Sequence, residues 1–246
     1  RLPKSWTDSP ERLRRARVPE EHQAFKTKHQ IALELLDQAL AEGHQARFVA
    51  ADAGYGASDA FRAELDVRGL QYAVGVRGES VAFVEAPNWL LPGDPTLAAN
   101  QKNPRLAPSN PRPKSLEEIA EGLPFREIAW RDGTKGKLRG SFARCRVWPA
   151  KDWQDGKCWL TPPVWLVVER RGKEFRYHFS NLSADISFVL LVRRIKSRWP
   201  VEQGYQQLKE ELGIDHFEGR SWVGLHHHIC MTFLAYGFLE LERRRL

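Results

Sequence analysis

The side chains best suited to chemistry lie in one segment near the end of the 246-residue chain. Because a helix advances about 100° per residue, Arg198, Glu202 and Lys209 would share one narrow wedge of a helix here. A neighbouring apolar stripe would let this helix bury one side: Val201, Tyr205, Leu208 and Leu212. The pattern therefore predicts one carboxylate between two cations, although a surface ladder of ion pairs has the same spacing.

A second carboxylate follows an apolar run far upstream. The run Phe48–Ala51 leads into Asp52, and Gly54 and Gly56 then allow a sharp turn. A buried strand that presents a carboxylate at its C-terminal end has this pattern. Asp52 is therefore a second candidate for catalysis.

Together, the two segments resemble the catalytic core of insertion-sequence transposases of the DDE superfamily, whose nuclease domain has a ribonuclease H-like fold. In that family an aspartate follows a strand in an apolar-Asp-x-x-Tyr-Gly context, and a glutamate lies in a Tyr-x2-Arg-x3-Glu-x6-Lys signature. The chain matches these motifs at Asp52, Arg198, Glu202 and Lys209, whereas Ile195 occupies the position of the signature tyrosine.

The resemblance extends over nearly the whole chain, through residues 213–222 and, near the start, residues 5–12. The family's first catalytic aspartate precedes the latter segment. Asp8 does not replace it, since Ser9, Pro10 and Glu11 make this the start of a helix. We therefore expect the C-terminal portion of a transposase, with the first strands and the first metal ligand missing.

The resemblance implies metal-dependent DNA cleavage and strand transfer at the ends of a mobile element. Asp52 and Glu202 would hold two Mg²⁺ ions, for which Mn²⁺ would substitute. Arg198 and Lys209 would bind phosphates and keep Glu202 ionised. The implied partners are terminal inverted repeats, target DNA and further copies of the chain, associated with the nucleoid in a bacterial cytoplasm.

Composition agrees with a DNA partner. The chain has 38 Lys and Arg against 31 Asp and Glu, a formal net charge of +7, which favours a polyanion. No apolar run is long enough to predict membrane insertion. Three widely spaced cysteines indicate neither a disulfide framework nor a zinc site, and they fit a reducing cytoplasm.

The remaining patterns predict an α/β fold: a ribonuclease H-like mixed sheet flanked by helices, with a β-rich insertion before the glutamate-bearing helix. Three segments are expected, a partial catalytic core at 1–82, a Pro-rich linker and the insertion at 83–182, and a helical part of the core at 183–246. Helices are predicted at 21–41, 58–67, 116–121, 184–212 with a kink at Pro200, and 224–245, the last covering one face of the sheet. Strands are predicted at 47–52, 70–76, 125–131, 141–148, 164–169 and 175–179.

Two further groups are candidate DNA contacts. The glycine-bearing turn with Lys135, Lys137 and Arg139 is suited to following a phosphate backbone, and a solvated hairpin tip is an equal alternative. His216, Arg220 and Trp222 form the second group, in which Trp222 either stacks on a base or fills a groove. Consecutive histidines at 226–228 point about 100° apart on a helix, so they are not expected to share a metal.

Two alternatives to a working transposase stay open. The first is an inactive remnant that only binds DNA or a partner chain. The second is a metal-independent hydrolase in which Asp52 and Glu202 act as an acid and base pair. The missing aspartate distinguishes the remnant from the transposase, and metal dependence distinguishes the hydrolase.

Overall fold

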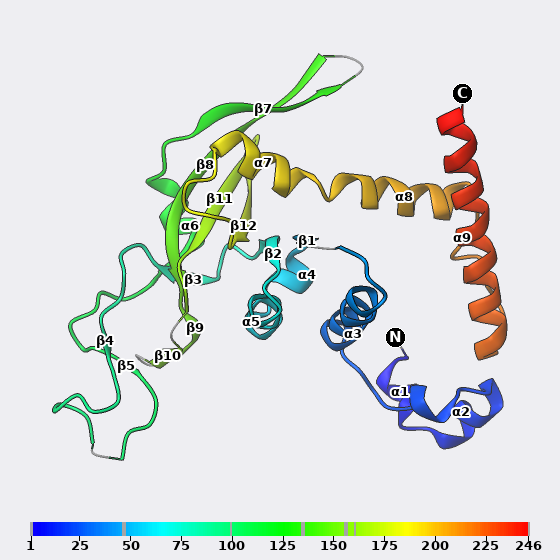
Figure 1. Ribbon diagram of the computed structural model, residues 1–246, viewed down its shortest axis with the longest axis horizontal. Helices are drawn as coiled ribbons and strands as arrows, with labels where there is room; N and C mark the ends of the chain where they lie inside the picture. Colours follow the sequence, from blue (N-terminus) through cyan, green and yellow to red (C-terminus); the bar gives the residue numbers. More distant parts are fainter. Residues whose placement is uncertain are drawn as a thin grey trace. The chain divides into compact units, whose positions relative to one another are not determined.

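The computed structural model describes residues 2–45, 48–98, 100–133, 136–154, 157–159 and 161–245 (Figure 1). The chain divides into two compact units. One consists of Arg1–Gly43 with Trp199–Leu246, and the other of His44–Arg198. Each unit is described by itself below.

The unit His44–Arg198 is built on a mixed sheet of eight strands, in the order β1-β2-β12-β11-β8-β3-β6, with β7 paired to β8. The strands are β1 (Phe48–Ala51), β2 (Gln71–Val76), β3 (Val81–Phe83), β6 (Lys114–Ser115), β7 (Arg126–Gly133), β8 (Gly136–Pro149), β11 (Val164–Arg171) and β12 (Glu174–Ser180). β1 and β2 are parallel, as predicted, and the other pairs are antiparallel. The predicted mixed α/β fold is confirmed, and it is consistent with a ribonuclease H-like fold.

The strands expected in the β-rich insertion continue the sheet that β1 and β2 begin. β12 pairs directly with β2, with Phe179 opposite Val74 and His178 opposite Gly75. β11 and β8 follow in turn. Two small sheets lie apart from this order, β4 (Trp89–Leu90) with β5 (Arg105–Leu106), and β9 (Lys151–Gln154) with β10 (Lys157–Trp159).

Among its described residues, this unit has four helices: α4 (Ala53–Gly56), α5 (Asp59–Val67), α6 (Leu116–Glu121) and α7 (Phe188–Lys196). Serine side chains accept hydrogen bonds at three helix starts, Ser58 on α5, Ser115 on α6 and Ser187 on α7. Apolar side chains of α7 pack on β8 and β11 in one core cluster with Phe142 and Val167. This packing fixes α7 on one face of the sheet.

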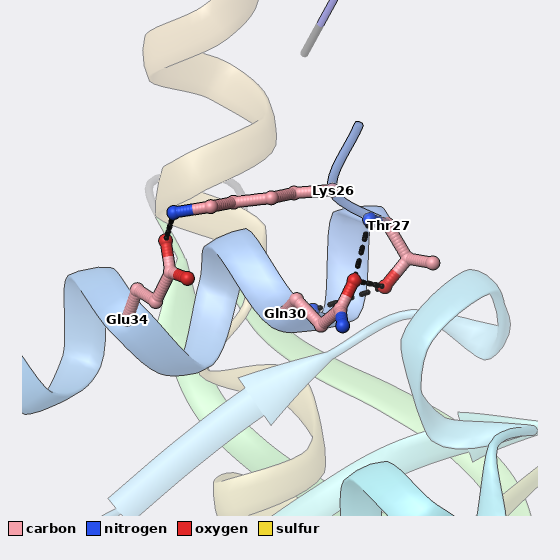
Figure 2. A network of polar contacts seen from close by, with 4 residues as sticks. All are labelled: Lys26, Thr27, Gln30 and Glu34. Carbon is pink, nitrogen blue, oxygen red and sulfur yellow. Dashed lines mark hydrogen bonds and ion pairs between the residues drawn. The ribbon is translucent and has the colours of Figure 1, made fainter. Parts of the chain in front are cut away.

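The other unit begins with short helices, α1 (Lys4–Thr7), α2 (Pro10–Ala16) and the 3-10 turn η1 (Glu20–His22). The predicted helix 21–41 is shorter than expected, since α3 spans Lys28–Ala41. Thr27 and Gln30 form a capping box that sets this start (Figure 2). Before the box, Lys26 pairs with Glu34 at 2.8 Å across the first turns of α3 (Figure 2).

The kinked helix predicted for 184–212 is wrong in detail, because two helices occupy this segment. α7 ends at Lys196 and α8 spans Trp199–Glu210. Pro200 has no N–H to bond the carbonyl of Lys196 and its ring crowds that carbonyl, so the first helix ends there. Pro200 instead lies in the first turn of α8, where its missing N–H costs nothing.

The last helix, α9, spans Trp222–Arg245 and begins two residues earlier than predicted. Within its unit it contacts α8, where the Tyr236 hydroxyl donates to Gln207 at 3.4 Å. Just after α8, Glu211 pairs with Arg243 at 3.4 Å. Since α9 and the sheet belong to different units, covering of the sheet by α9 stays a prediction. In the part of the chain that the structure describes, no helix is long and apolar enough to span a bilayer.

Candidate functional site

Asp52 lies where β1 ends, as the sequence predicted. It is the N-cap of α4, and its Oδ1 accepts a hydrogen bond from the backbone N–H of Gly54 at 2.8 Å. The side chain is exposed. The backbone therefore holds an accessible carboxylate at the carboxyl edge of the two parallel strands.

Two glycines allow α4 to pack directly on β2 beside Asp52. A Cβ added to Gly56 would lie 2.2 Å from the carbonyl oxygen of Gly75, and one added to Gly75 would lie 2.7 Å from the backbone nitrogen of Ala53. Neither position has room for a methyl group unless the backbone shifts. Gly56 of the Asp-x-Gly-Tyr-Gly segment and Gly75 of β2 thus allow this close approach, which in turn fixes Asp52 at the edge.

Glu202 and Lys209 lie on α8, in the other unit, and both side chains are exposed. They line one open cleft of about 700 Å³. Its remaining lining residues come from α8 and the segment that follows: Tyr205, Gln206, Glu210, Asp215 and His216. The helix thus brings the predicted glutamate and lysine together at one concave surface, with two further carboxylates at its rim.

Arg198 lies in the turn between α7 and α8, and it belongs to the same unit as Asp52. Of the four residues predicted to be catalytic, Asp52 and Arg198 therefore belong to one unit, and Glu202 and Lys209 belong to the other. Ile195, at the position of the signature tyrosine, is buried in the core cluster of α7 and the sheet. An apolar residue suits this position because the side chain packs inward.

Sequence reasoning missed a charged cluster on the face of the sheet that α7 covers. Glu169 of β11 is 4% exposed and pairs with Lys196 of α7 and, at 2.9 Å, with Arg171. Burial by itself raises the pKa of Glu169, but hydrogen bonds and charges from Arg171 and Lys196 outweigh it and lower the pKa. The sequence signal for this cluster was Glu169 itself, which lies on the same face of an apolar strand as the buried residues Trp165 and Val167.

His178 of β12 lies beside this cluster. Its Nε2 atom is buried and has no hydrogen-bond partner among the described residues. The pKa of His178 is lowered to about 4, mainly by burial; Glu169 opposes this effect, and the positive charges of Lys196, Arg198 and Arg171 add to it. The imidazole is therefore neutral at pH 7.

The basic turn contributes less free charge than its sequence indicates. Lys137 lies opposite Asp132 in the β7–β8 register, and Arg139 pairs with Glu127 at 3.2 Å. The Arg139–Glu127 pair is exposed, so its contribution to stability is small and DNA phosphates can compete for the arginine. Lys135 lies outside the described residues.

The residues of the second predicted DNA-contact group differ in exposure. His216 is largely exposed, 3.8 Å from Asp215, and Arg220 is exposed in the same loop. Trp222 packs against the cluster of Leu13, Ala16 and Val18, and stacks on the ring of His22 with centroids 5.1 Å apart. This packing supports the groove-filling alternative for Trp222.

The histidines at 226–228 diverge, as the helical geometry predicted. His226 Nδ1 contacts the carbonyl of Trp222 at 2.9 Å, whereas His228 Nε2 contacts the carbonyl of Gly213 at 3.1 Å. The first contact lies within α9, whereas the second joins α9 to the loop that precedes it. His228 therefore helps to hold this loop against α9.

Carboxylates such as Asp52 and Glu202 are the hard oxygen donors that Mg²⁺ and Mn²⁺ take. Within the described residues, however, no group of three or more His, Cys, Asp or Glu side chains lies close enough together to hold a metal ion. The donor types fit a divalent ion, and the two candidate ligands are described in separate units.

A mixed α/β fold with an exposed aspartate at the carboxyl edge of its parallel strands is compatible with an enzyme of the nuclease class. The family model of the DDE superfamily endonucleases matches residues 1–137, more than half of the chain and including Asp52. The chain belongs to this family. The family implies a DNA substrate and nuclease-type activity, and its members typically use divalent metal ions. No curated protein matches the chain.

Proposed function

We propose that this protein is a DDE-type transposase that cleaves DNA at the ends of a mobile element and joins those ends to target DNA. The observation that carries the proposal is the family match across the segment that ends β1 in an exposed Asp52. The Arg198, Glu202 and Lys209 spacing, outside the matched residues, adds independent support. A net charge of +7 favours a polyanionic partner such as DNA.

Each proposed catalytic residue has a separate role in this scheme. Asp52 and Glu202 would hold divalent ions, which when bound supply an activated oxygen nucleophile and stabilise the leaving oxygen. Arg198 offers a planar fork and Lys209 a point charge to the phosphates of the DNA. Assembly of several copies on paired DNA ends is part of the same proposal.

The test is nicking of supercoiled plasmid with Mg²⁺, with Mn²⁺ and with EDTA. We expect Asp52→Asn and Glu202→Gln each to lower the nicking rate by at least about 100-fold, because each removes an ionised carboxylate from the reacting centre. DNA binding should stay within about twofold, since neither substitution removes a cation that neutralises phosphate.

Matched controls make the same chemical changes elsewhere. Asp8→Asn and Glu85→Gln alter exposed carboxylates outside the proposed site, and they should nick at the wild-type rate. Nicking by the Glu202→Gln variant at the control rate would remove Glu202 from the catalytic group. Nicking that persists in EDTA would favour the metal-independent hydrolase instead, and DNA binding without any nicking would favour the inactive remnant.

A further inference from the structure

A group of basic side chains lies at the same edge of the sheet as Asp52. β1 and β2 run parallel, so their carboxyl ends share an edge, and β12 runs antiparallel to β2 with Tyr177 opposite Val76. Arg176 precedes Tyr177 and therefore lies at that edge, directly opposite Glu169 of β11. Arg176 and His178 are two residues apart, so both lie on the face that carries Glu169.

Positive charge exceeds negative charge in this group. Arg171, Arg176 and Lys196 surround Glu169, which is buried and already paired with two of them. Glu174, opposite Arg171, adds a second carboxylate at the rim. Burial has the largest effect on the pKa of Lys196 and lowers it. The hydrogen bond and charge of Glu169 oppose this effect, the charges of Arg171 and Arg176 add to it, and the pKa is lowered overall. Three cations thus share this part of the sheet with two carboxylates.

The exposed cations are the two arginines. The side chain of Arg171 is 46% exposed and that of Arg176 is also exposed, whereas Lys196 is 15% exposed. Arg171 uses its Nε to bond Glu169, and a guanidinium carries five N–H donors in all. Beneath them, the buried Nε2 of His178 has no partner among the described side chains and backbone groups. Two exposed guanidinium groups beside a buried ion pair are suited to binding oxyanions.

We propose that Arg171 and Arg176, supported by Lys196, bind phosphate groups of the DNA strand at the edge of the sheet that carries Asp52. This inference rests on the proposed function, because it takes DNA as the substrate. The Glu169–Lys196 pair holds the end of α7 on the sheet beneath the arginines. Glu169 also orients Arg171 through the Nε hydrogen bond, so part of the site is formed before DNA binds.

The test measures the affinity of the whole chain for a fluorescein-labelled DNA duplex by anisotropy, without divalent metal, over a range of salt concentrations. For Arg171→Gln with Arg176→Gln, we expect a dissociation constant about tenfold higher near 0.1 M salt and a salt slope about 2 smaller. For Arg176→Gln alone, which leaves the pairs of Glu169 intact, the slope should fall by about 1.

The matched control removes two exposed arginines elsewhere in the same unit, Arg105→Gln with Arg112→Gln, and should bind as wild type. Equal slopes for the double variant and its control, with wild-type binding intact, would overturn this inference and leave the proposed function standing. Absence of DNA binding by the wild-type chain would overturn both. A lower slope for Arg176→Gln together with wild-type binding by the control would support the site.

Discussion

Asp52 and Glu169 show how differently two carboxylates can be held in one sheet. Asp52 is exposed and accepts a single backbone hydrogen bond from Gly54, so its environment leaves it accessible to a ligand. Glu169 is buried and its charge is balanced by Lys196 and Arg171. Removing one partner of such a buried group costs several kcal/mol, because the other charge is left uncompensated. Glu169 is therefore a structural carboxylate, whereas the exposure of Asp52 is compatible with the catalytic role proposed for it.

His178 should make the stability of the protein depend on pH. In the unfolded chain its pKa is near 6.5, whereas burial lowers the folded value to about 4. Between these values the unfolded state binds the proton that the folded state excludes, so folding stability falls as the pH decreases. Between pH 7 and pH 5 we expect His178 to account for a loss of about 2 kcal/mol in the free energy of unfolding.

Urea denaturation at pH 7 and pH 5 measures this loss. His178→Phe removes the titrating group and should reduce the difference between the two pH values, whereas His227→Gln, an exposed histidine, should keep it. Glu169 does not contribute to this difference, because its pKa is lowered in the folded state. The stability that its ionised form contributes is lost only as the pH falls below about 4.5. An unchanged pH dependence in His178→Phe would show that the imidazole is not desolvated.

Local sequence pattern was enough to predict where Asp52, Glu202 and Lys209 lie, because each is marked by its own neighbours; their catalytic role stays a prediction. Asp52 follows an apolar run, and α8 does place Glu202 and Lys209 on one cleft. The buried cluster could not be found in the same way. Lys196 neutralises Glu169 from 27 residues further along the chain, and only the packing of α7 on β11 brings them together.

At the level of elements, the sequence predicted strands and helices wherever one local rule applied. The helix after Ser58 and the parallel pair β1 and β2 agree with it. The predicted helix boundaries were wrong where two local rules compete. Residues 21–27 have helical periodicity, but the capping box at Thr27 and Gln30 offers a better helix start. In α7 and α8 the apolar pattern is continuous, and Pro200 nevertheless decides where the first helix ends.

The packing of α4 on β2 is the element contact most sensitive to substitution. Gly56→Ala would place a methyl group 2.2 Å from the Gly75 carbonyl oxygen and 2.6 Å from the Cβ of Val74. We expect the free energy of unfolding to fall by about 1–3 kcal/mol, as for other overpacked sites. Nicking should fall as well, because α4 must move and Asp52 is its cap.

Gly122→Ala is the matched control, since a Cβ there would have its nearest neighbour at 3.9 Å. Chemical denaturation should place this variant close to wild type. A wild-type free energy of unfolding for Gly56→Ala would show that α4 does not pack on β2 as closely as these distances indicate. Reduced nicking with normal stability would instead point to a local displacement of Asp52.

At the scale of the whole molecule, the order of strands is the feature that no local pattern predicts. β12 lies between β2 and β11, so residues about 100 positions apart in sequence form adjacent strands. This order brings Arg176 to the edge that carries Asp52. It also places the β7–β8 hairpin, with Lys137 and Arg139, in the same sheet as the two arginines.

Two basic surfaces on one sheet should contribute to binding of one DNA. Gln substitutions of Lys137 with Arg139, and of Arg171 with Arg176, should each lower the salt slope of DNA binding by about 2. The quadruple variant should lower it by about 4, since distant sites on one ligand add. Its net charge falls from +7 to +3, so the control must lose the same charge.

The control substitutes Gln at four other basic positions of the same unit: Lys102, Arg105, Arg112 and Lys114. It shares any loss of long-range attraction caused by net charge alone. A quadruple variant that loses no more slope than either double variant would mean that only one surface meets the DNA. A slope equal to that of the control would mean that the general positive field of the protein, rather than these four side chains, determines its affinity.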